Sequence, residues 1–298
     1  MPELPDITLY IEALRERIVG RRLERSRVLS PFLLRSVDPS IDAVTGASVA
    51  ALERIGKRIA IGFDNDIWLV LHLMIAGRLQ WRASWPPSFT RQTLLALGFD
   101  SGTLVLTEAG TKRRASLYVV QGRAGIAQHQ PGGVELDRIT ADEFEAVLKR
   151  GNHTLKRALT DPRLISGIGN AYSDEILHRA RLSPVMLTSR LTSEQSARLF
   201  AAARAVLAEW LQRLRSKTRG EFPRKVTAFH EEMAVHGRYG LPCPACGTKV
   251  QRIRYAENET NYCPRCQTSG RLLADRSLSR LLKRDWPKSI DELEQMRP

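Results

Sequence analysis

Near the start of the chain, apolar residues recur every three or four positions between Pro5 and Val19. They are Ile7, Tyr10, Ile11, Leu14 and Ile18, with Glu12, Arg15, Glu16 and Arg17 between them. A stripe at this spacing is typical of a helix that packs one face on a core and leaves the other in water. The pattern therefore predicts an amphipathic helix.

The next part of the chain alternates short apolar runs with turn sequences. Polar residues typical of turns, Asp64-Asn65-Asp66 and Asp100-Ser101-Gly102, separate pairs of runs. The runs are Arg58 to Phe63, Ile67 to Leu73, Gly77 to Arg82, Leu94 to Phe99, Thr103 to Thr107 and Leu117 to Val120. Short strands at this spacing predict a β-sandwich or barrel.

A polar, glycine-containing segment at 128–133 ends this pattern, and helical spacing follows it. Short helices are expected at Ala141 to Leu148, Thr154 to Leu159 and Ala171 to Leu177. Thr192-Ser193-Glu194-Gln195 is a capping box that opens a longer helix. Its predicted buried face is Leu199, Ala203, Val206, Leu207, Trp210, Leu211 and Leu214. In the tail, Leu278, Leu281 and Leu282 predict one more short helix.

Composition adds an electrostatic constraint. The chain has 298 residues, 43% hydrophobic and 26% charged, which excludes a disordered or fibrous protein. Lysine and arginine number 46 against 32 acidic residues, a net charge of +14. Such a charge favours a polyanionic partner, and nucleic acid is the first candidate.

A membrane-surface protein is the alternative explanation of the charge. The longest apolar run, Ile67 to Gly77, is too short to span a bilayer and contains His72. Residues 1–20 contain four acidic side chains and lack the continuous apolar stretch of a signal sequence. We therefore expect a cytoplasmic protein with no membrane partner, nucleoid-associated if the source is bacterial.

The four cysteines form two identical pairs, Cys243-Pro-Ala-Cys246 and Cys263-Pro-Arg-Cys266. Two Cys-x2-Cys knuckles match the tetrahedral demand of a structural Zn²⁺, one per chain. Four buried reduced cysteines would be the alternative, but they would not require two identical pairs. Three arginines around the knuckles, Arg252, Arg254 and Arg265, would direct this zinc hairpin at phosphate.

Basic residues cluster in two further places. The first is a run broken by one acid, Glu221, and it reads as a mobile loop because it contains Gly220 and Pro223. Its basic residues are Arg213, Arg215, Lys217, Arg219, Arg224 and Lys225, and the second cluster is Lys112-Arg113-Arg114. A solvated charged loop would explain either cluster alone. Together with the zinc hairpin they predict a footprint the size of a DNA duplex.

Two shorter motifs are ambiguous by themselves. Ser166-Gly167-Ile168-Gly169-Asn170 could point backbone N–H groups at a phosphate from the start of a helix, although most such sequences are only turns. Met1-Pro2-Glu3 is an ordinary chain start, but removal of Met1 would expose the secondary amine of Pro2. A secondary amine that attacks an aldehyde carbon stays as a charged iminium, which is an electron sink for elimination.

These elements together resemble the formamidopyrimidine-DNA glycosylase and endonuclease VIII family along the whole chain. The matching motifs are the Pro-Glu-Leu-Pro start, Gly56-Lys57, His72-Leu73, Gly167-Ile168-Gly169-Asn170, His236-Gly237-Arg238 and the four-cysteine finger, in the family's order. The resemblance implies an α+β multidomain fold: an N-terminal β-sandwich flanked by helices (1–130), a helix-two-turn-helix domain (131–235), a zinc-finger hairpin (236–274) and a C-terminal tail (275–298). It also implies damaged DNA as the partner, bound in the cleft between the domains by a monomer without a small-molecule cofactor.

The resemblance also implies roles for single residues. Pro2 is similar to the nucleophile that attacks C1′ of a flipped-out nucleotide, Glu3 to the acid that assists opening of the deoxyribose, and Lys57 to a general acid and phosphate ligand. His72, Lys156 and Asn170 match positions that grip phosphates, which position DNA without reading its sequence. Further DNA contacts are implied for Ile75, Arg113, Arg114 and Asn258.

The sequence departs from the family at several of these positions. Many relatives fill the emptied base stack with methionine and phenylalanine, whereas this chain has Ile75 and Ala115. The segment Ser216 to Lys225 lacks the family's glycine-threonine pattern for lesion reading, and Asn258 stands where an arginine is usual. Two classes therefore stay open: a bifunctional glycosylase and abasic-site lyase acting by β-elimination, or a DNA-binding protein of the same fold that recognises damage without cutting.

Overall fold

A computed structural model describes residues 1–110, 112–224, 226, 230–255, 258–275 and 286–295. Its contacts divide the chain into two compact units, and each is treated by itself. The first comprises residues 1–131 and 209–228, and the second residues 132–208 and 229–298. The predicted helix-two-turn-helix domain, 131–235, includes residues 209–228, whereas the contacts group those residues with the first unit. The predicted domain bounds remain a proposal.

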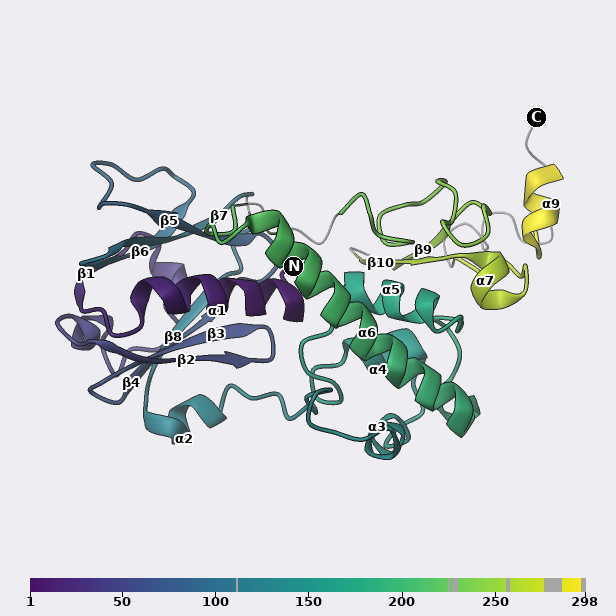
Figure 1. Ribbon diagram of the computed structural model, residues 1–298, viewed down its shortest axis with the longest axis horizontal. Coiled ribbons are helices and arrows are strands. Elements are labelled where there is room, and N and C mark those ends of the chain that lie inside the picture. The colour runs from purple at the N-terminus through teal and green to yellow at the C-terminus, as the bar shows by residue number, and fades with distance from the viewer. Residues whose placement is uncertain (111, 225, 227–229, 256–257, 276–285, 296–298) are drawn as a thin grey trace. The chain divides into compact units, whose positions relative to one another are not determined.

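The first unit begins with α1 (Leu4–Ile18), as predicted. Pro5 lies in its first turn, where the missing N–H costs no helical hydrogen bond. The predicted apolar stripe is fully inside: Ile7, Tyr10, Leu14 and Ile18 are each 0% exposed. They join one core cluster with apolar residues of two β-sheets, so that α1 (purple in Figure 1) is anchored in the sandwich.

Two four-stranded antiparallel sheets form the sandwich that the sequence predicted. One has the order β2-β3-β4-β8 and the other β1-β6-β7-β5. Their bounds are β1 Leu23–Val28, β2 Val49–Ile55, β3 Arg58–Phe63, β4 Ile67–His72, β5 Gly77–Arg82, β6 Thr93–Phe99, β7 Gly102–Glu108 and β8 Ser116–Gln121. All six predicted runs are strands. The two strands that the sequence analysis missed, β1 and β2, lie at sheet edges, where exposed polar residues interrupt the apolar pattern.

Short helical segments connect these strands and continue into the second unit. Three are 3₁₀ turns, and α2 was not predicted. The bounds are η1 Pro31–Leu33, η2 Ile41–Val44, α2 Gly122–Ala127, α3 Ala141–Leu148, α4 Leu155–Thr160, α5 Asn170–Arg179 and η3 Thr188–Arg190. The predicted helices at Ala141, Thr154 and Ala171 correspond to α3, α4 and α5 within one residue at each start. Thr140 caps α3 through a reciprocal pair of bonds with Glu143.

The long helix α6 (Ser193–Thr218) begins at the predicted capping box. Thr192 and Gln195 exchange hydrogen bonds there, each backbone N–H donating to the other's side chain. The predicted face is buried except at Leu211, which is half-buried. The helix continues to Thr218, so Arg213, Arg215 and Lys217 are helical and the prediction of a mobile loop is wrong for them.

The C-terminal part of the second unit holds a two-stranded hairpin of β9 (Gln251–Tyr255) and β10 (Asn258–Tyr262), followed by α7 (Pro264–Thr268). A last helix, α9 (Ile290–Gln295), follows it in the chain. The tail helix predicted around Leu278, Leu281 and Leu282 lies outside the described residues. Within the described part of the chain, no helix has the length and apolar character needed to cross a membrane.

Candidate active site

The N-terminus of α1 is the first part of the candidate site. Pro2 and Glu3 are both buried, Glu3 with 1% of its surface exposed. The backbone N–H of Glu3 donates to Asp6 Oδ2 at 2.8 Å, which fixes the extended residue before the helix. The start of the helix therefore holds Pro2 and Glu3 in the interior of the first unit, with Met1 half-buried.

Burial also changes the protonation of the amine. Desolvation lowers the pKa of the Met1 amine, and the charges of Arg78 and Lys57 lower it further against the opposing carboxylates of Glu3 and Asp6. A lowered pKa leaves more of the amine neutral at neutral pH. A neutral amine has the free electron pair that a nucleophile needs.

Lys57 and Arg78 are the two cations whose charges lower the pKa of the terminal amine, and only Lys57 was predicted. Lys57 lies in the turn between β2 and β3, where Gly56 has a φ of +57°, and it is half-buried. Arg78 is near the start of β5, and its Nη1 donates to the carbonyls of Ile75 and Gly77 at 3.1 and 2.7 Å. Sequence analysis missed Arg78 because it belongs to no motif and faces the N-terminus only after folding.

His72 lies at the end of β4, opposite Arg58 of β3. Burial, followed by the charges of Arg58 and Lys57, lowers the pKa of His72 to about 4. The imidazole is therefore neutral at pH 7. It can donate one hydrogen bond to a phosphate, but it adds no positive charge.

Ile75 and Ala115, at the two predicted wedge positions, have opposite environments. Ile75 is 53% exposed and follows Met74, whose φ of +51° turns the chain outward. Ala115 is only 3% exposed, and its N–H donates to the buried carboxylate of Glu108 at 3.0 Å. Only Ile75 presents an apolar group to solvent. Arg113 and Arg114, beside Ala115, are both exposed.

In the second unit, the glycine turn leads directly into α5. Gly169 is its N-cap in an extended conformation, and Asn170 is its first residue, half-buried. Lys156, on α4, reaches across to this turn: its Nζ donates to the Asn170 carbonyl at 2.6 Å and forms an ion pair with Asp174 at 2.5 Å. The structure therefore brings the predicted Lys156 and Asn170 together.

Two buried acids on α5, Asp174 and Glu175, were missed by the sequence analysis. Asp174 Oδ2 lies 2.8 Å from His236 Nδ1 and also accepts the backbone N–H of Asn261 in β10 at 3.2 Å. Glu175 accepts the backbone N–H groups of residues 234–236 at 2.7 to 3.0 Å, and burial raises its pKa. Through these contacts, Glu175 connects α5 to residues 234–236, and Asp174 connects it to His236 and to β10 of the hairpin. Two adjacent acids in the middle of the predicted helix at Ala171 to Leu177 were the available signal.

The four cysteines form a candidate metal centre. Their sulfur atoms all lie within 4.8 Å of one another, with Cys243 to Cys266 at 3.9 Å and Cys246 to Cys263 at 3.4 Å. Tetrahedral coordination with Zn–S bonds of about 2.3 Å requires sulfurs about 3.8 Å apart. The sulfur positions fit a single zinc ion, as predicted, and His178 Nε2 lies 3.2 Å from Cys243 Sγ.

The hairpin carries Asn258 at the first position of β10, where it is exposed. The arginines predicted to face phosphate have different environments. Arg252 lies 3.7 Å from Glu259 and stacks on the Tyr239 ring, and Arg265 lies 3.2 Å from Asp291. Arg254 has an exposed side chain. Arg254 lies next in sequence to Tyr255, the strand partner of Asn258, and is itself paired with Glu259 across the hairpin.

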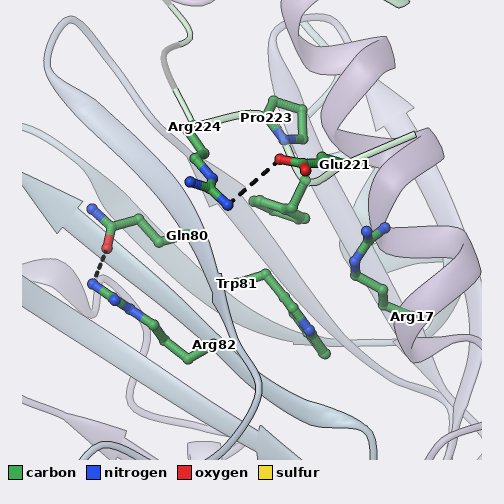
Figure 2. A pocket seen from close by; sticks show the side chains of 8 residues that line it. Arg17, Gln80, Trp81, Arg82, Glu221, Pro223 and Arg224 are labelled. Atoms are coloured by element: carbon green, nitrogen blue, oxygen red, sulfur yellow. Dashed lines mark hydrogen bonds and ion pairs between the residues drawn. The ribbon is translucent and has the colours of Figure 1, made fainter. Parts of the chain in front are cut away.

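The segment after α6 packs on the sandwich of the first unit (Figure 2). Arg215 is held by two hydrogen bonds to the Glu12 carboxylate on α1. Phe222 is 8% exposed, with ring centroids 5.8 Å from Tyr10 and 6.3 Å from Trp81. Beside it lies a pocket of about 590 Å³, lined by Arg17, Gln80, Trp81, Arg82, Glu221, Phe222, Pro223 and Arg224. Lys225, the last basic residue of the predicted run, lies outside the described residues.

The chain is similar to known proteins in all three of its predicted domains. Three family models match: the formamidopyrimidine-DNA glycosylase N-terminal domain at residues 1–115, the formamidopyrimidine-DNA glycosylase H2TH domain at 133–220, and a zinc finger found in FPG and IleRS at 240–268.

Relatives match along most of the chain. A formamidopyrimidine-DNA glycosylase of Pelotomaculum thermopropionicum is 30% identical, over 90% of this chain and 99% of its own length. The crystal structure of the MutM (Fpg) protein of Thermus thermophilus matches with 31% identity and a TM-score of 0.74, over 89% of this chain and 98% of that one. A MutM structure in complex with carbocyclic 8-oxo-G containing DNA has the same fold, with a TM-score of 0.79, 22% identity, and 90% and 100% coverage.

Proposed function

The chain belongs to the formamidopyrimidine-DNA glycosylase family and is a base-excision-repair DNA glycosylase, and we propose that Pro2, Glu3 and Lys57 carry its chemistry. The observation that supports this assignment best is the start of the chain, where Pro2 and Glu3 are buried and the terminal amine has a lowered pKa under the charges of two carboxylates and two cations. A protein that only bound DNA would have no use for such an amine.

Pro2 is the proposed nucleophile once Met1 has been removed. Its neutral nitrogen forms a bond to C1′ of the damaged nucleotide, and the bond from C1′ to the base breaks with both electrons leaving on the base. The nitrogen then loses its proton, and the C1′–O4′ bond of the deoxyribose breaks with its electrons on O4′, which takes up a proton, while the nitrogen lone pair forms a double bond to C1′. The charged iminium that results draws the electrons of a C2′–H bond as C2′ loses a proton. The C3′–O bond then breaks and the 3′ phosphate leaves. This β-elimination cuts the strand at the abasic site.

Glu3 and Lys57 have complementary roles in this proposal. Glu3, buried beside the nucleophile, donates the proton that opens the deoxyribose ring. The charge of Lys57 lowers the pKa of the Met1 amine, and we propose the same effect on the Pro2 nitrogen that becomes the terminus once Met1 is removed, with a phosphate of the DNA as a further contact of Lys57. The DNA is held by His72, Ile75, Arg113 and Arg114 from the first unit and by Lys156, Asn170 and Asn258 from the second.

The four cysteines would hold one zinc ion that keeps the hairpin folded. A site closed by four thiolates has no open position for water or substrate, so its role is structural. Damaged DNA is the proposed partner, and we propose that the protein acts as a monomer without a small-molecule cofactor, since one chain supplies both the nucleophile and the acid.

Borohydride trapping with an abasic oligonucleotide tests the nucleophile. Reduction converts an iminium into a stable covalent adduct, so the wild type should be trapped. Pro2→Gly, or an N-terminus blocked by a retained tag, should lose most of the adduct while still binding DNA. Equal trapping by the blocked protein would refute the assignment of Pro2. Absence of any adduct from the wild type would favour the damage-recognising binding protein.

A second comparison separates Glu3 from Pro2. Glu3→Gln should slow excision of a damaged base more than cleavage of a preformed abasic site, because opening an intact nucleoside demands more of the acid. Equal losses on the two substrates would contradict this division of roles.

A further inference from the structure

A surface on the outer side of the sheet β1-β6-β7-β5 combines arginines with aromatic rings. The chain between β5 and β6 folds back over this side, where Trp85 packs so closely on β6 that a Cβ at Gly98 would lie 2.8 Å from the ring. We call the group Arg25, Arg27, Trp85, Phe89, Arg91 and Arg113 the basic–aromatic surface. None of the elements assigned above to catalysis uses it, apart from Arg113 at its border.

Stacking holds two of these arginines in place. The Arg25 guanidinium lies 4.3 Å from the centroid of the Trp85 ring, and that of Arg27 lies 5.6 Å from Phe89. The two rings meet edge to face, with centroids 5.4 Å apart at 87°. Arg25 and Arg27 alternate on the edge strand β1, so they project from the same face about 6.8 Å apart along it. This is close to the spacing of successive phosphates on an extended nucleic-acid strand.

A guanidinium stacked on a ring keeps its N–H donors free around the edge of its plane. Stacking also fixes its orientation before any ligand arrives, which lowers the entropy lost on binding. Packing of the chain between β5 and β6 on the sheet requires only the apolar rings of Trp85 and Phe89. It does not explain why the residues stacked on these rings are positively charged.

The charges of this surface have no carboxylate partners among the described residues. Arg25, Arg27, Arg91 and Arg113 are all exposed, and none forms an ion pair in that part of the chain. A cavity of about 840 Å³ at its border is lined by two arginines and no acid: Leu29, Phe89, Thr90, Arg91, Gln92, Thr93, Gly110 and Arg113. Four unneutralised cations repel one another unless a polyanion lies between them.

The surface is continuous with the β7–β8 loop, which is proposed to touch DNA. Arg113, on that loop, donates from Nη2 to the carbonyl of Arg91 at 2.6 Å. A strand held at Arg113 therefore needs only to continue over Arg91 to reach Arg25 and Arg27.

We infer that the basic–aromatic surface binds the phosphate backbone of DNA that extends beyond the lesion site. This inference rests on the proposed function, because it takes Arg113 as a point on the DNA path. The first unit would then have a second DNA-contacting region, which binds DNA on one side of the lesion, while the active site binds the lesion itself.

The test compares the double variant Arg25→Gln/Arg27→Gln with the wild type on two duplexes. One carries an abasic site on the shortest DNA that the wild type still traps with borohydride, and the other extends the same duplex on both sides. A matched control, Arg15→Gln/Arg150→Gln, removes the same charge from exposed arginines elsewhere.

The double variant should bind the long duplex more weakly than the wild type does, and the slope of log affinity against log salt should decrease by about 1.8, or about 0.9 for each of two phosphates. Trapping and affinity on the short duplex should not change. Phe89→Leu, which removes one ring and no charge, should give a smaller loss on the long duplex only.

Equal losses on both duplexes, or a loss no larger than that of the control, would overturn the inference. So would a wild type that gains no affinity from the longer DNA. Failure of the proposed function would look different: the wild type would then give no covalent adduct on either duplex, while the dependence of binding on duplex length could still be measured on undamaged DNA.

Discussion

Asp6 is a buried carboxyl group in the first turn of α1, and its protonation makes the stability of the folded chain depend on pH. It is 0% exposed, and desolvation raises its pKa to about 7 in spite of the hydrogen bond from the Glu3 N–H. The unfolded chain releases the same proton near pH 4, at about 3.9. The folded state therefore binds more protons than the unfolded state between about pH 4 and about pH 7.

The free energy of unfolding should consequently decrease as pH rises through this window. Asp6→Asn keeps an acceptor for the Glu3 N–H and removes the titration, so its stability should change less between pH 5 and pH 8 than that of the wild type. Urea unfolding at the two pH values measures both. The exposed Asp137→Asn serves as the control, and an unchanged pH dependence in Asp6→Asn would contradict the argument.

Lys156 and Asp174 form a second residue-scale unit. The Lys156 side chain is 13% exposed and that of Asp174 0%, so each charge depends on the other. Removing one partner of a buried pair typically costs about 3 to 5 kcal/mol, because the remaining charge stays buried without compensation.

Lys156→Met should therefore destabilise the protein strongly, and Lys156→Met/Asp174→Asn should be more stable than the single variant. Chemical unfolding of both variants, with Asp174→Asn completing the cycle, gives the coupling free energy. Additive losses would mean that the pair does not act as a unit and that Lys156 is free to serve phosphate alone.

At the scale of elements, the zinc hairpin has little apolar surface of its own. The cluster around the cysteines contains Val235, Val250 and the cysteines themselves, and a second small cluster on the strands contains Ile253, Tyr262 and Leu273. With two such small clusters, the metal should supply much of the hairpin's stability. Metal analysis should find close to one zinc per chain. Cys246→Ser should lose that zinc and weaken DNA binding, while the near-UV and far-UV spectra of the β-sandwich are retained. A metal-free protein with full DNA affinity would disprove the structural role.

The tip of the same hairpin decides the product in our proposal. Asn258 is neutral, and a neutral hydrogen bond to a departing phosphate is about half as strong as a charge-assisted one. The first elimination depends on the iminium at Pro2 and should persist, whereas the second, δ-elimination, should be slow. Cleavage of an end-labelled abasic oligonucleotide should give mainly the 3′ unsaturated aldehyde.

Asn258→Arg should raise the share of the 3′-phosphate product in the same gel assay. Arg254→Gln is the companion variant, because Arg254 is the neighbouring exposed arginine. A wild type that releases mainly 3′-phosphate would contradict the role of Asn258, and loss of that product in Arg254→Gln would transfer the role to Arg254.

At the scale of the whole molecule, the net charge of +14 acts on every phosphate at once. Log affinity for a lesion duplex should fall linearly with log salt, by about 0.9 for each phosphate neutralised. The ratio of lesion to undamaged affinity should change far less, since phosphate contacts position DNA without specifying it. Titrations at several salt concentrations measure both quantities, and a salt-insensitive complex would remove the electrostatic basis of binding.

The sequence by itself determined the elements whose signal is local. The helical stripe of α1, the six apolar runs, the capping box at Thr192 and the two Cys-x2-Cys knuckles depend on neighbours a few residues apart, and the structure confirms each as an element or a cluster. The family resemblance rests on such motifs too. The edge strand β1 was not predicted, because half of its residues are exposed and its sequence has no alternating apolar pattern.

Only the tertiary structure decided which distant residues share an environment. The charge of Arg78 acts on the terminal amine, which is distant from it in the sequence. Asp174 contacts both Lys156 and His236, and Arg25 of β1 stacks on Trp85 in the chain between β5 and β6. None of these pairs has a characteristic spacing. A pKa or an ion pair depends on distance and burial in three dimensions, and folding brings such groups together through the packing of elements whose separation along the chain is not constrained.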